Sequence, residues 1–358
     1  MSTNSYDAAC DDATAPNRRG LLRGAGLATA AALAGTALSR PAQAAHEHVV
    51  PAPVYFPTSY VREVNLINKN IVITGASRGI GRATALDLVK AGANVWGTSR
   101  TPQDYPGITE YPLMELRLED PASIAAFVAA IGAATGGRVD VLINNAAQLV
   151  FGTPTPLSPA AFPIWAQNSA LALRVVYLGH RELTIAMLGL MQHSGYRRIL
   201  FTASVAAYAS SADIGSDFYQ PYVAGKRAIA DFANSLGIWF SRIGLDIRVA
   251  TVNPVTTHTD GTLGTRPIFL EPVDEEGNPD PASPLAAVLP LIRAAVESGQ
   301  PAKVVARAYR QLLELKRPHP NVVAGVRRGP LAEAGQVPLT LAARRKEMKD
   351  GAMPWACE

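Results

Sequence analysis

From residue 71 to residue 81 the chain reads Ile71-Val72-Ile73-Thr74-Gly75-Ala76-Ser77-Arg78-Gly79-Ile80-Gly81. The β-branched residues at the start of this run are typical of a short strand that is buried on both faces. The glycines after them permit a tight turn and let the backbone approach a pyrophosphate at the N-terminus of a helix. Such a turn is weak evidence by itself, but a helical pattern over residues 82–91 follows it directly. The run therefore predicts a dinucleotide-binding turn between a strand and a helix.

Strand and helix patterns alternate along most of the remaining chain. Further strands are predicted at residues 93–98, 112–116, 139–143, 198–203, 246–252 and 322–324. Further helices are predicted at residues 121–133, 159–192, 222–241, 285–297 and 302–315, the second of which Pro163 interrupts near its start. Such alternation forms a parallel sheet with helices on both faces. We therefore predict an α/β fold, a Rossmann-like doubly wound parallel sheet in a single domain with a C-terminal helical extension.

The composition is that of a folded, water-soluble protein. Of the 358 residues, 48% are hydrophobic and 17% are charged, which is enough apolar material for a full core. The 33 basic and 29 acidic side chains give a formal charge of +4 without a stripe of Lys and Arg, so no nucleic-acid partner is expected. The two cysteines lie near opposite ends of the chain and the six histidines are scattered. We therefore expect neither a disulfide scaffold nor a metal site.

Residues 1–44 have the pattern of an export signal. A basic head with Arg18 and Arg19 precedes a weakly apolar run at residues 24–38, and the small-residue pattern Ala42-Gln43-Ala44 follows. The apolar run is too short for a stable membrane span. The paired arginines resemble a twin-arginine signal, whose pathway exports folded proteins, and an ordinary secretory signal is the alternative. We expect a periplasmic or extracellular protein, or a cytoplasmic one if the signal is not used.

The rest of the chain divides into three predicted segments. These are a lead-in at residues 45–68, a nucleotide-binding domain at residues 69–325 and a C-terminal tail at residues 326–358. Within the domain, a loop at about residues 255–284 is rich in proline and acidic residues towards its end. We predict that this loop covers the substrate.

Charge near the second predicted strand bears on the choice of nucleotide. A free ribose 2′-hydroxyl is usually held by an acidic residue at the end of that strand, whereas a 2′-phosphate needs cations. Here the strand ends in Thr98-Ser99-Arg100 with no carboxylate before Asp104, and the glycine turn carries Arg78. These features favour NADP(H) over NAD(H). The alternative interpretation is that Arg100 is simply a solvated charge in a loop and binds no phosphate.

A second cluster is Tyr222-Val223-Ala224-Gly225-Lys226, within a predicted helix. Helix positions four apart share a face, so this phenol and this ammonium can point into one cleft. A phenol is a poor base at neutral pH, but a neighbouring ammonium and a cationic nicotinamide lower its pKa. Most Tyr-x-x-x-Lys patterns are surface pairs, yet of the 11 tyrosines only Tyr222 is followed by lysine at this spacing. The pair predicts a proton-transfer site.

The order of these features resembles the short-chain dehydrogenase/reductase family over about residues 65–325. After the glycine turn come Asn144-Asn145-Ala146-Ala147 at a strand end, Ser204 after another strand, and the Tyr222/Lys226 pair. The cofactor residues expected from the resemblance and the charge pattern are Gly75, Ser77, Arg78, Gly79, Ile80, Gly81, Arg100, Asn144, Ala146, Tyr222, Lys226 and Thr257. Ala147 departs from the family's closing glycine, and Thr259 is the alternative to Thr257 for a bond to the nicotinamide carboxamide.

The catalytic residues that the resemblance implies are Ser204, Tyr222, Lys226 and Asn168. Ser204 would orient the substrate, with Ser210 and Ser211 as fallback candidates. The family's relay asparagine, which holds a water, is ambiguous. Counting forward from the Asn-Asn-Ala motif reaches Asn168, whereas counting back from Ser204 reaches Val176. We favour Asn168 because a valine side chain cannot bind water.

The resemblance implies an oxidoreductase that interconverts a carbonyl and an alcohol. In this hypothesis Ser204 binds the substrate oxygen, Tyr222 exchanges the proton, and Lys226 stabilises the phenolate and holds the nicotinamide ribose of NADP(H). The alternatives are a non-catalytic cofactor-binding or scaffold protein of the same fold, and an epimerase or dehydratase that uses the same pair. The expected partner is a small-molecule carbonyl or alcohol, and a homo-oligomer is expected by analogy with the family.

Overall fold

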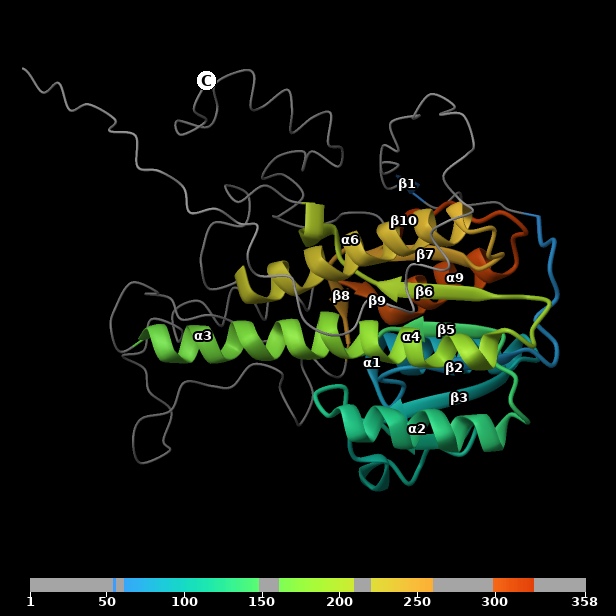
Figure 1. Ribbon diagram of the computed structural model, residues 1–358, viewed down its shortest axis with the longest axis horizontal. Coiled ribbons are helices and arrows are strands. Elements are labelled where there is room, and N and C mark those ends of the chain that lie inside the picture. The colour runs from blue at the N-terminus through green and yellow to red at the C-terminus, as the bar shows by residue number, and fades with distance from the viewer. Residues whose placement is uncertain (1–53, 56–60, 148–160, 209–219, 260–298, 325–358) are drawn as a thin grey trace, which may run out of the picture. The chain divides into compact units, whose positions relative to one another are not determined.

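The computed structural model describes residues 54–55, 61–147, 161–208, 220–259 and 299–324 (Figure 1). Several predicted segments lie outside these ranges. They are the export signal at residues 1–44, the helix at 285–297, the tail at 326–358 and most of the substrate loop at 255–284.

Parallel strands form the central sheet, as the alternating pattern predicts. They are β1 (Val54–Tyr55), β2 (Asn70–Ile73), β3 (Asn94–Ser99), β4 (Leu113–Glu115), β5 (Val141–Asn144), β6 (Arg198–Thr202), β7 (Arg248–Pro254) and β10 (Asn321–Ala324). Their order across the sheet is β1-β10-β7-β6-β5-β2-β3-β4 (Figure 1). The predicted strands are confirmed to within one or two residues at most ends. The two-residue β1 adds an edge strand beside β10 that the sequence pattern does not predict.

The strand order reverses once, and this reversal locates the site. From β2 the chain adds β3 and β4 on one side, then returns to place β5 on the other side of β2. Doubly wound sheets form a crevice where successive connections leave in opposite directions, and here that point lies between the carboxyl ends of β2 and β5. Ligands of doubly wound sheets bind in this crevice.

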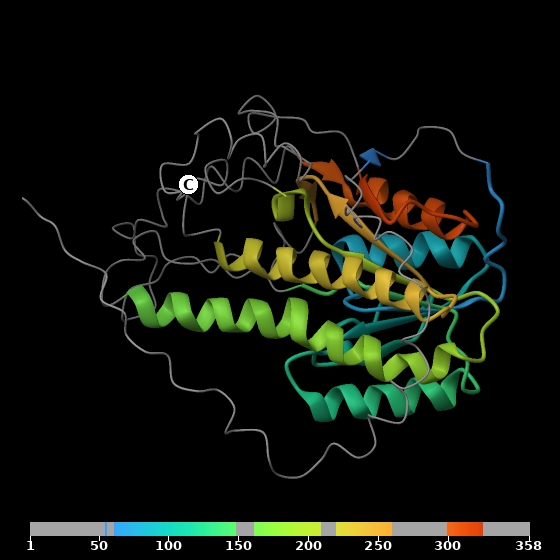
Figure 2. The ribbon, with the colours of Figure 1, turned by 45° about the horizontal axis from the view of Figure 1, so that its top comes forward.

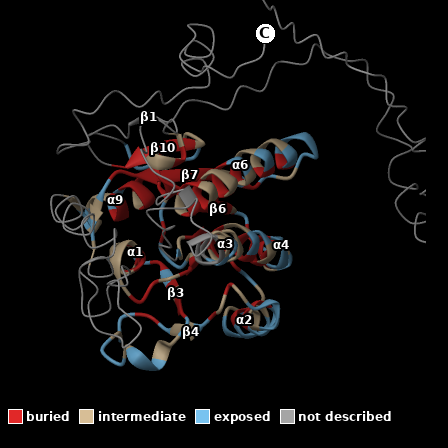
Figure 3. Cartoon of the chain, turned by 90° about the vertical axis from the view of Figure 1, so that its left-hand side faces the viewer, coloured by how far each residue is buried: buried red, intermediate tan, exposed pale blue. Residues whose placement is uncertain are grey.

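Helices cover both faces of the sheet (Figure 2). On one face lie α1 (Gly79–Lys90) and α9 (Ala302–Leu313), and on the other lie α2 (Pro121–Ala134), α4 (His180–Met191) and α6 (Gln220–Arg242). The helix α3 (Ala161–Ala172) and the π-helical turn η2 (Leu173–Gly179) lead into α4 and pack against α6. Alternate residues of β2 enter the two cores, since Ile71 and Ile73 face α1 and α9 whereas Val72 faces the other helices. Figure 3 shows that burial is concentrated in the strands and the helix faces against them.

Two local features differ from the sequence prediction. Pro163 does not interrupt the helix within the described residues, because α3 runs without a break from Ala161 to Ala172. The irregular part is instead η2, which begins at Leu173. In addition, β8 (Thr257–His258) and β9 (Gln300–Pro301) pair in a small separate sheet.

No helix within the described ranges is both long enough and apolar enough to cross a bilayer.

Candidate active site

The glycine turn joins the carboxyl end of β2 to α1, at the crevice. Gly75 has a φ of +67°, which favours glycine. A Cβ atom at Gly75 would lie 2.9 Å from Cα of Ala146, and one at Gly81 would lie 2.1 Å from the carbonyl oxygen of Gly75. Arg78 is the N-cap residue of α1, and its side chain makes no capping hydrogen bond. The turn therefore forms a backbone cradle at a helix N-terminus, which suits a pyrophosphate.

Hydrogen bonds tie this turn to the loop after β5. The hydroxyl oxygen of Thr74 accepts the backbone N–H groups of Asn145 and Ala146, at 2.8 and 2.9 Å. In return, Nδ2 of Asn145 donates to the carbonyl oxygens of Thr74 and Gly75, at 3.0 and 3.3 Å. These bonds hold the two walls of the crevice at a fixed spacing.

The helix α6 carries the Tyr222/Lys226 pair. Nζ of Lys226 lies 5.8 Å from the centre of the Tyr222 ring, which confirms that the two residues share a helix face. The same Nζ donates to the carbonyl oxygen of Thr202 at 2.7 Å, at the end of β6. Lys226 is only 3% exposed, and this burial lowers its pKa to about 8. The ammonium is therefore held close to the phenol in surroundings of low polarity, where its field is strong.

Ser204 follows β6 and is buried, two residues beyond the carbonyl that Lys226 contacts. Its Oγ accepts the backbone N–H of Ala206 at 3.2 Å, and a hydroxyl that accepts one hydrogen bond can still donate its own proton. A hydroxyl donor and a cation-supported phenol on neighbouring elements are groups that can carry out acid–base chemistry.

A family model described as short chain dehydrogenase matches residues 69–267. The chain belongs to the short-chain dehydrogenase/reductase family. The 2,3-dihydro-2,3-dihydroxybenzoate dehydrogenase of Escherichia coli K12 is 31% identical over 194 residues, which are 54% of this chain and 71% of that protein. The chain is thus an enzyme of the NAD(P)-dependent dehydrogenases and reductases.

Solved structures of short-chain dehydrogenases share the fold. One from Burkholderia phymatum, in complex with NAD, has a TM-score of 0.59 and 20% identity, and the match covers 82% of this chain and 99% of that one. One from Burkholderia cenocepacia, in complex with NADP, has a TM-score of 0.53 and 22% identity, and the match covers 73% of this chain and 96% of that one.

In this short-chain dehydrogenase, some expected cofactor residues line the cradle and others do not face it. Gly79 lies beside Thr259, because a Cβ atom added at Gly79 would be 3.2 Å from Cβ of Thr259. Thr257 instead uses its hydroxyl within its own segment, where it donates to the carbonyl oxygen of Val255 at 2.7 Å. The Asn144 side chain is 1% exposed and donates to Thr184 at 3.0 Å, so it faces the core.

The other expected cofactor residues lie in the turn itself or directly after β3. Ser77 is buried, Arg78 and Ile80 are half-buried, and Arg100 is exposed directly after β3. The Arg100 position is the strand end at which a nucleotide ribose is usually recognised.

The relay residue stays a prediction. Asn168 lies in α3, but its side chain is outside the described part of the chain. Val176 lies in η2 and is buried against α6, because a Cβ at Gly225 would be 3.4 Å from Cβ of Val176. The valine therefore packs directly beside the residue that precedes Lys226.

Sequence reasoning missed three polar side chains that support the site. Thr202 donates its hydroxyl to Oδ1 of Asn145 at 3.1 Å and forms a close hydrogen bond with the Tyr309 hydroxyl. Burial raises the pKa of Tyr309, so this phenol stays neutral. Nε2 of His180 lies 3.0 Å from the hydroxyl oxygen of Thr74. No sequence motif marks these residues, because only the fold brings their distant elements together.

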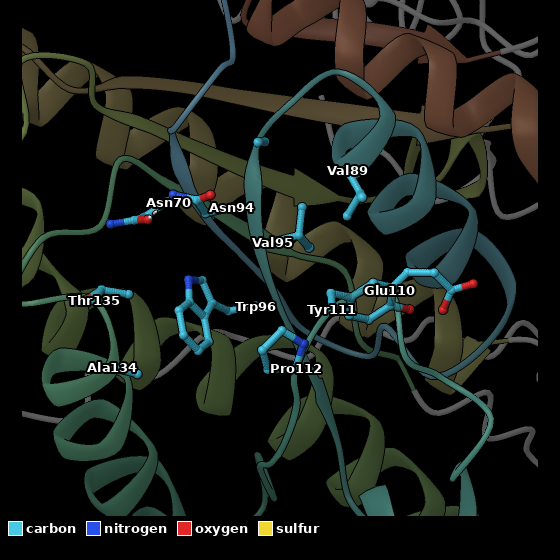
Figure 4. A pocket seen from close by; sticks show the side chains of 11 residues that line it. Asn70, Val89, Asn94, Val95, Trp96, Glu110, Tyr111, Pro112, Ala134 and Thr135 are labelled. Carbon is cyan, nitrogen blue, oxygen red and sulfur yellow. Dashed lines mark hydrogen bonds between the residues drawn. The ribbon is translucent and has the colours of Figure 1, made fainter.

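A hollow of about 420 Å³ lies elsewhere on the domain (Figure 4). Its lining includes Asn70 and Asn94, the first residues of β2 and β3, together with Trp96 and Tyr111. It therefore lies at the amino ends of the strands, away from the cradle at their carboxyl ends.

Proposed function

We propose that this chain is an NADP(H)-dependent oxidoreductase that interconverts a carbonyl and an alcohol through Ser204, Tyr222 and Lys226. The observation that carries the proposal is the buried Lys226 ammonium, 5.8 Å from the Tyr222 ring and bonded to the end of β6. Ser204 lies two residues beyond that bond. The glycine turn, a backbone cradle on the same edge of the sheet, supports the binding of a dinucleotide there.

Each residue has a distinct task in this proposal. Ser204 donates a hydrogen bond to the substrate oxygen, which holds the reacting carbon in one orientation. Tyr222 donates a proton to that oxygen in the reducing direction and removes it in the oxidising direction. Lys226 stabilises the phenolate left on Tyr222, because two of its three N–H donors remain beyond the one that Thr202 receives. The dinucleotide, when bound, supplies or accepts the hydride.

The choice of NADP(H) rests on positive charge. Arg78 occupies the N-cap position of α1 and Arg100 follows β3, while no carboxylate stands at the end of that strand. Arginine pairs well with the additional phosphate of NADP(H). The solved relatives bind NAD in one case and NADP in another, which supports a nicotinamide cofactor without selecting between the two.

Turnover by the Tyr222→Phe variant tests the proposal. NADPH oxidation is measured with a panel of ketones, quinones, sugars and steroids, on the parent chain, on Tyr222→Phe and on Tyr196→Phe. The control deletes a phenol just before β6, at the opposite end of the strand from the site. We expect the turnover of Tyr222→Phe to fall at least ~100-fold and the turnover of the Tyr196→Phe control to equal that of the parent chain. Full turnover by Tyr222→Phe would overturn the assignment.

We also propose that residues 1–44 direct export through a twin-arginine-type pathway. The support is the sequence pattern alone, with Arg18 and Arg19 before the apolar run. Fractionation of cells that express the parent chain or an Arg18→Lys, Arg19→Lys variant tests this proposal. Only uncleaved parent protein in the cytosol would contradict it.

A homo-oligomer is a further part of the proposal. Large apolar side chains are exposed on two helices that cover the same face of the sheet, with Ile185 on α4 48% exposed and Trp239 on α6 51% exposed. Light scattering of the purified protein tests it, and a monomer at micromolar concentration would contradict it.

A further inference from the structure

His180 is a buried imidazole that the proposed chemistry does not use. It is the first residue of α4, directly after η2, and it is 2% exposed. Its Nε2 lies 3.0 Å from Oγ1 of Thr74, and its Nδ1 lies 3.0 Å from the carbonyl oxygen of Val176. The ring therefore lies between the residue that begins the glycine turn and the π-helical turn that packs against α6.

The bonds of Thr74 Oγ1 determine which nitrogen of His180 carries the proton. A hydroxyl has one proton and two lone pairs. The N–H groups of Asn145 and Ala146 occupy both lone pairs. The hydroxyl proton then needs an acceptor, and Nε2 of His180 at 3.0 Å is closer than the carbonyl oxygen of Ile143 at 3.5 Å. Nε2 is therefore unprotonated, and Nδ1–H donates to Val176.

The surroundings of His180 keep the ring neutral, as this arrangement requires. Burial lowers the pKa of His180 to about 4, against a smaller opposing effect of the hydrogen bond to Val176. The Lys226 ammonium lowers the pKa further. A protonated ring would direct Nε2–H at an oxygen whose lone pairs are already used.

The orientation of the Thr74 hydroxyl matters for the nucleotide cradle. Ala146 lies so close to Gly75 that a Cβ there would be 3.0 Å from Cβ of Ala146. The hydrogen bonds from the N–H groups of Asn145 and Ala146 to Oγ1 of Thr74 hold Ala146 against Gly75. They form only while the lone pairs of this oxygen point at the loop after β5. When Nε2 of His180 accepts the hydroxyl proton of Thr74, the proton points away from that loop and the lone pairs point towards it.

We propose that His180 is a positioning residue of the dinucleotide site, which acts by accepting the hydroxyl proton of Thr74. The inference rests on the proposed function, since it assumes that the glycine turn binds a nicotinamide dinucleotide. His180 contacts the start of the glycine turn through Thr74, and its effect passes through that residue to Asn145 and Ala146.

Two amide variants separate this role from a purely structural one. In His180→Gln, the terminal amide reaches about as far as Nε2 and can accept from Thr74. In His180→Asn, the shorter amide reaches only as far as Nδ1 and can contact Val176 alone. Dissociation constants for NADPH and NADH are measured by fluorescence titration of the full chain, with exposed His193→Asn as the control. We expect His180→Asn to bind ~10-fold more weakly and His180→Gln to stay within ~3-fold of the parent.

A double-mutant cycle adds the link to Thr74. In a Thr74→Ala background the Asn substitution at His180 is expected to have no further effect on the dissociation constant. Equal binding by His180→Gln and His180→Asn, or additive effects in the cycle, would overturn the inference.

The tautomer gives a readout that does not depend on the cofactor. Nitrogen-15 spectra of the parent chain are expected to show His180 as the Nδ1–H form at neutral pH, and an Nε2–H form would overturn the inference. Failure of the parent chain to bind either dinucleotide would overturn the proposed function itself, and this inference with it. The His180 variants test the inference alone, because their results do not change whether the parent chain binds a dinucleotide.

Discussion

Replacing Lys226 by methionine should raise the stability of the protein at neutral pH while it removes activity. Burial lowers the pKa of Lys226 from 10.5 to about 8, which corresponds to a cost of about 3 kcal/mol in the folded state at neutral pH. Methionine has a similar length and no charge, so that cost disappears. The carbonyl oxygen of Thr202 loses its hydrogen-bond donor in the variant. This loss lowers the gain in stability by about 1–2 kcal/mol. The net expectation is a stabilisation of about 1–2 kcal/mol.

The pH dependence provides the sharper test. The folded pKa lies below the unfolded one, so between about pH 8 and pH 10.5 the unfolded chain binds more protons at this site. The stability of the parent should therefore rise with pH in that window, by about 1.4 kcal/mol per pH unit. The variant lacks this rise, so its advantage should shrink and reverse by about pH 9.5.

Chemical denaturation of the parent, Lys226→Met and the exposed control Lys303→Met at a series of pH values measures these differences. The control should follow the parent throughout. A difference between the parent and Lys226→Met that stays constant from neutral pH to about pH 9.5 would refute the reasoning, and turnover by the variant at the parental rate would refute the catalytic role.

Other predictions follow from the same contacts. Gly81→Ala forces a Cβ to 2.1 Å from the Gly75 carbonyl oxygen, so dinucleotide affinity, measured by calorimetry, should fall at least ~100-fold, and unchanged affinity would contradict the cradle. Arg100→Ala should weaken NADPH ~10-fold more than NADH, and equal losses would remove the charge argument. Asp140→Ala leaves the Asn70 N–H and the Ser194 hydroxyl without their carboxylate, so the free energy of unfolding should fall by about 2–4 kcal/mol without a change in turnover below the melting temperature.

Much of the fold could be predicted because each strand carries a local signal. The run at residues 71–73 is wholly apolar and β-branched, and a parallel strand buried on both faces requires that composition. The glycine turn could be predicted for a similar reason, since the crowding at Gly75 and Gly81 excludes other residues. The pairing of Tyr222 with Lys226 follows from helix geometry alone.

The parts that could not be predicted depend on tertiary contacts. The direction of the Asn144 side chain, which faces Thr184 rather than the crevice, depends on how α4 packs under β5. No proline or glycine pattern in the sequence predicts the irregular turn η2. The contact between its Val176 carbonyl oxygen and Nδ1 of His180 forms only in the folded chain. Tyr309 reaches Thr202 only because α9 folds back across the sheet.

Isotope transfer measures the central claim most directly. Reduced dinucleotide that carries deuterium at both C4 positions of the nicotinamide ring is incubated with the parent chain and with Tyr222→Phe, using a substrate found in the carbonyl panel. Mass spectrometry of the alcohol should show deuterium on the former carbonyl carbon with the parent chain, and almost no alcohol with the variant. Unlabelled alcohol from the parent chain, or labelled alcohol formed equally fast by the variant, would contradict the account.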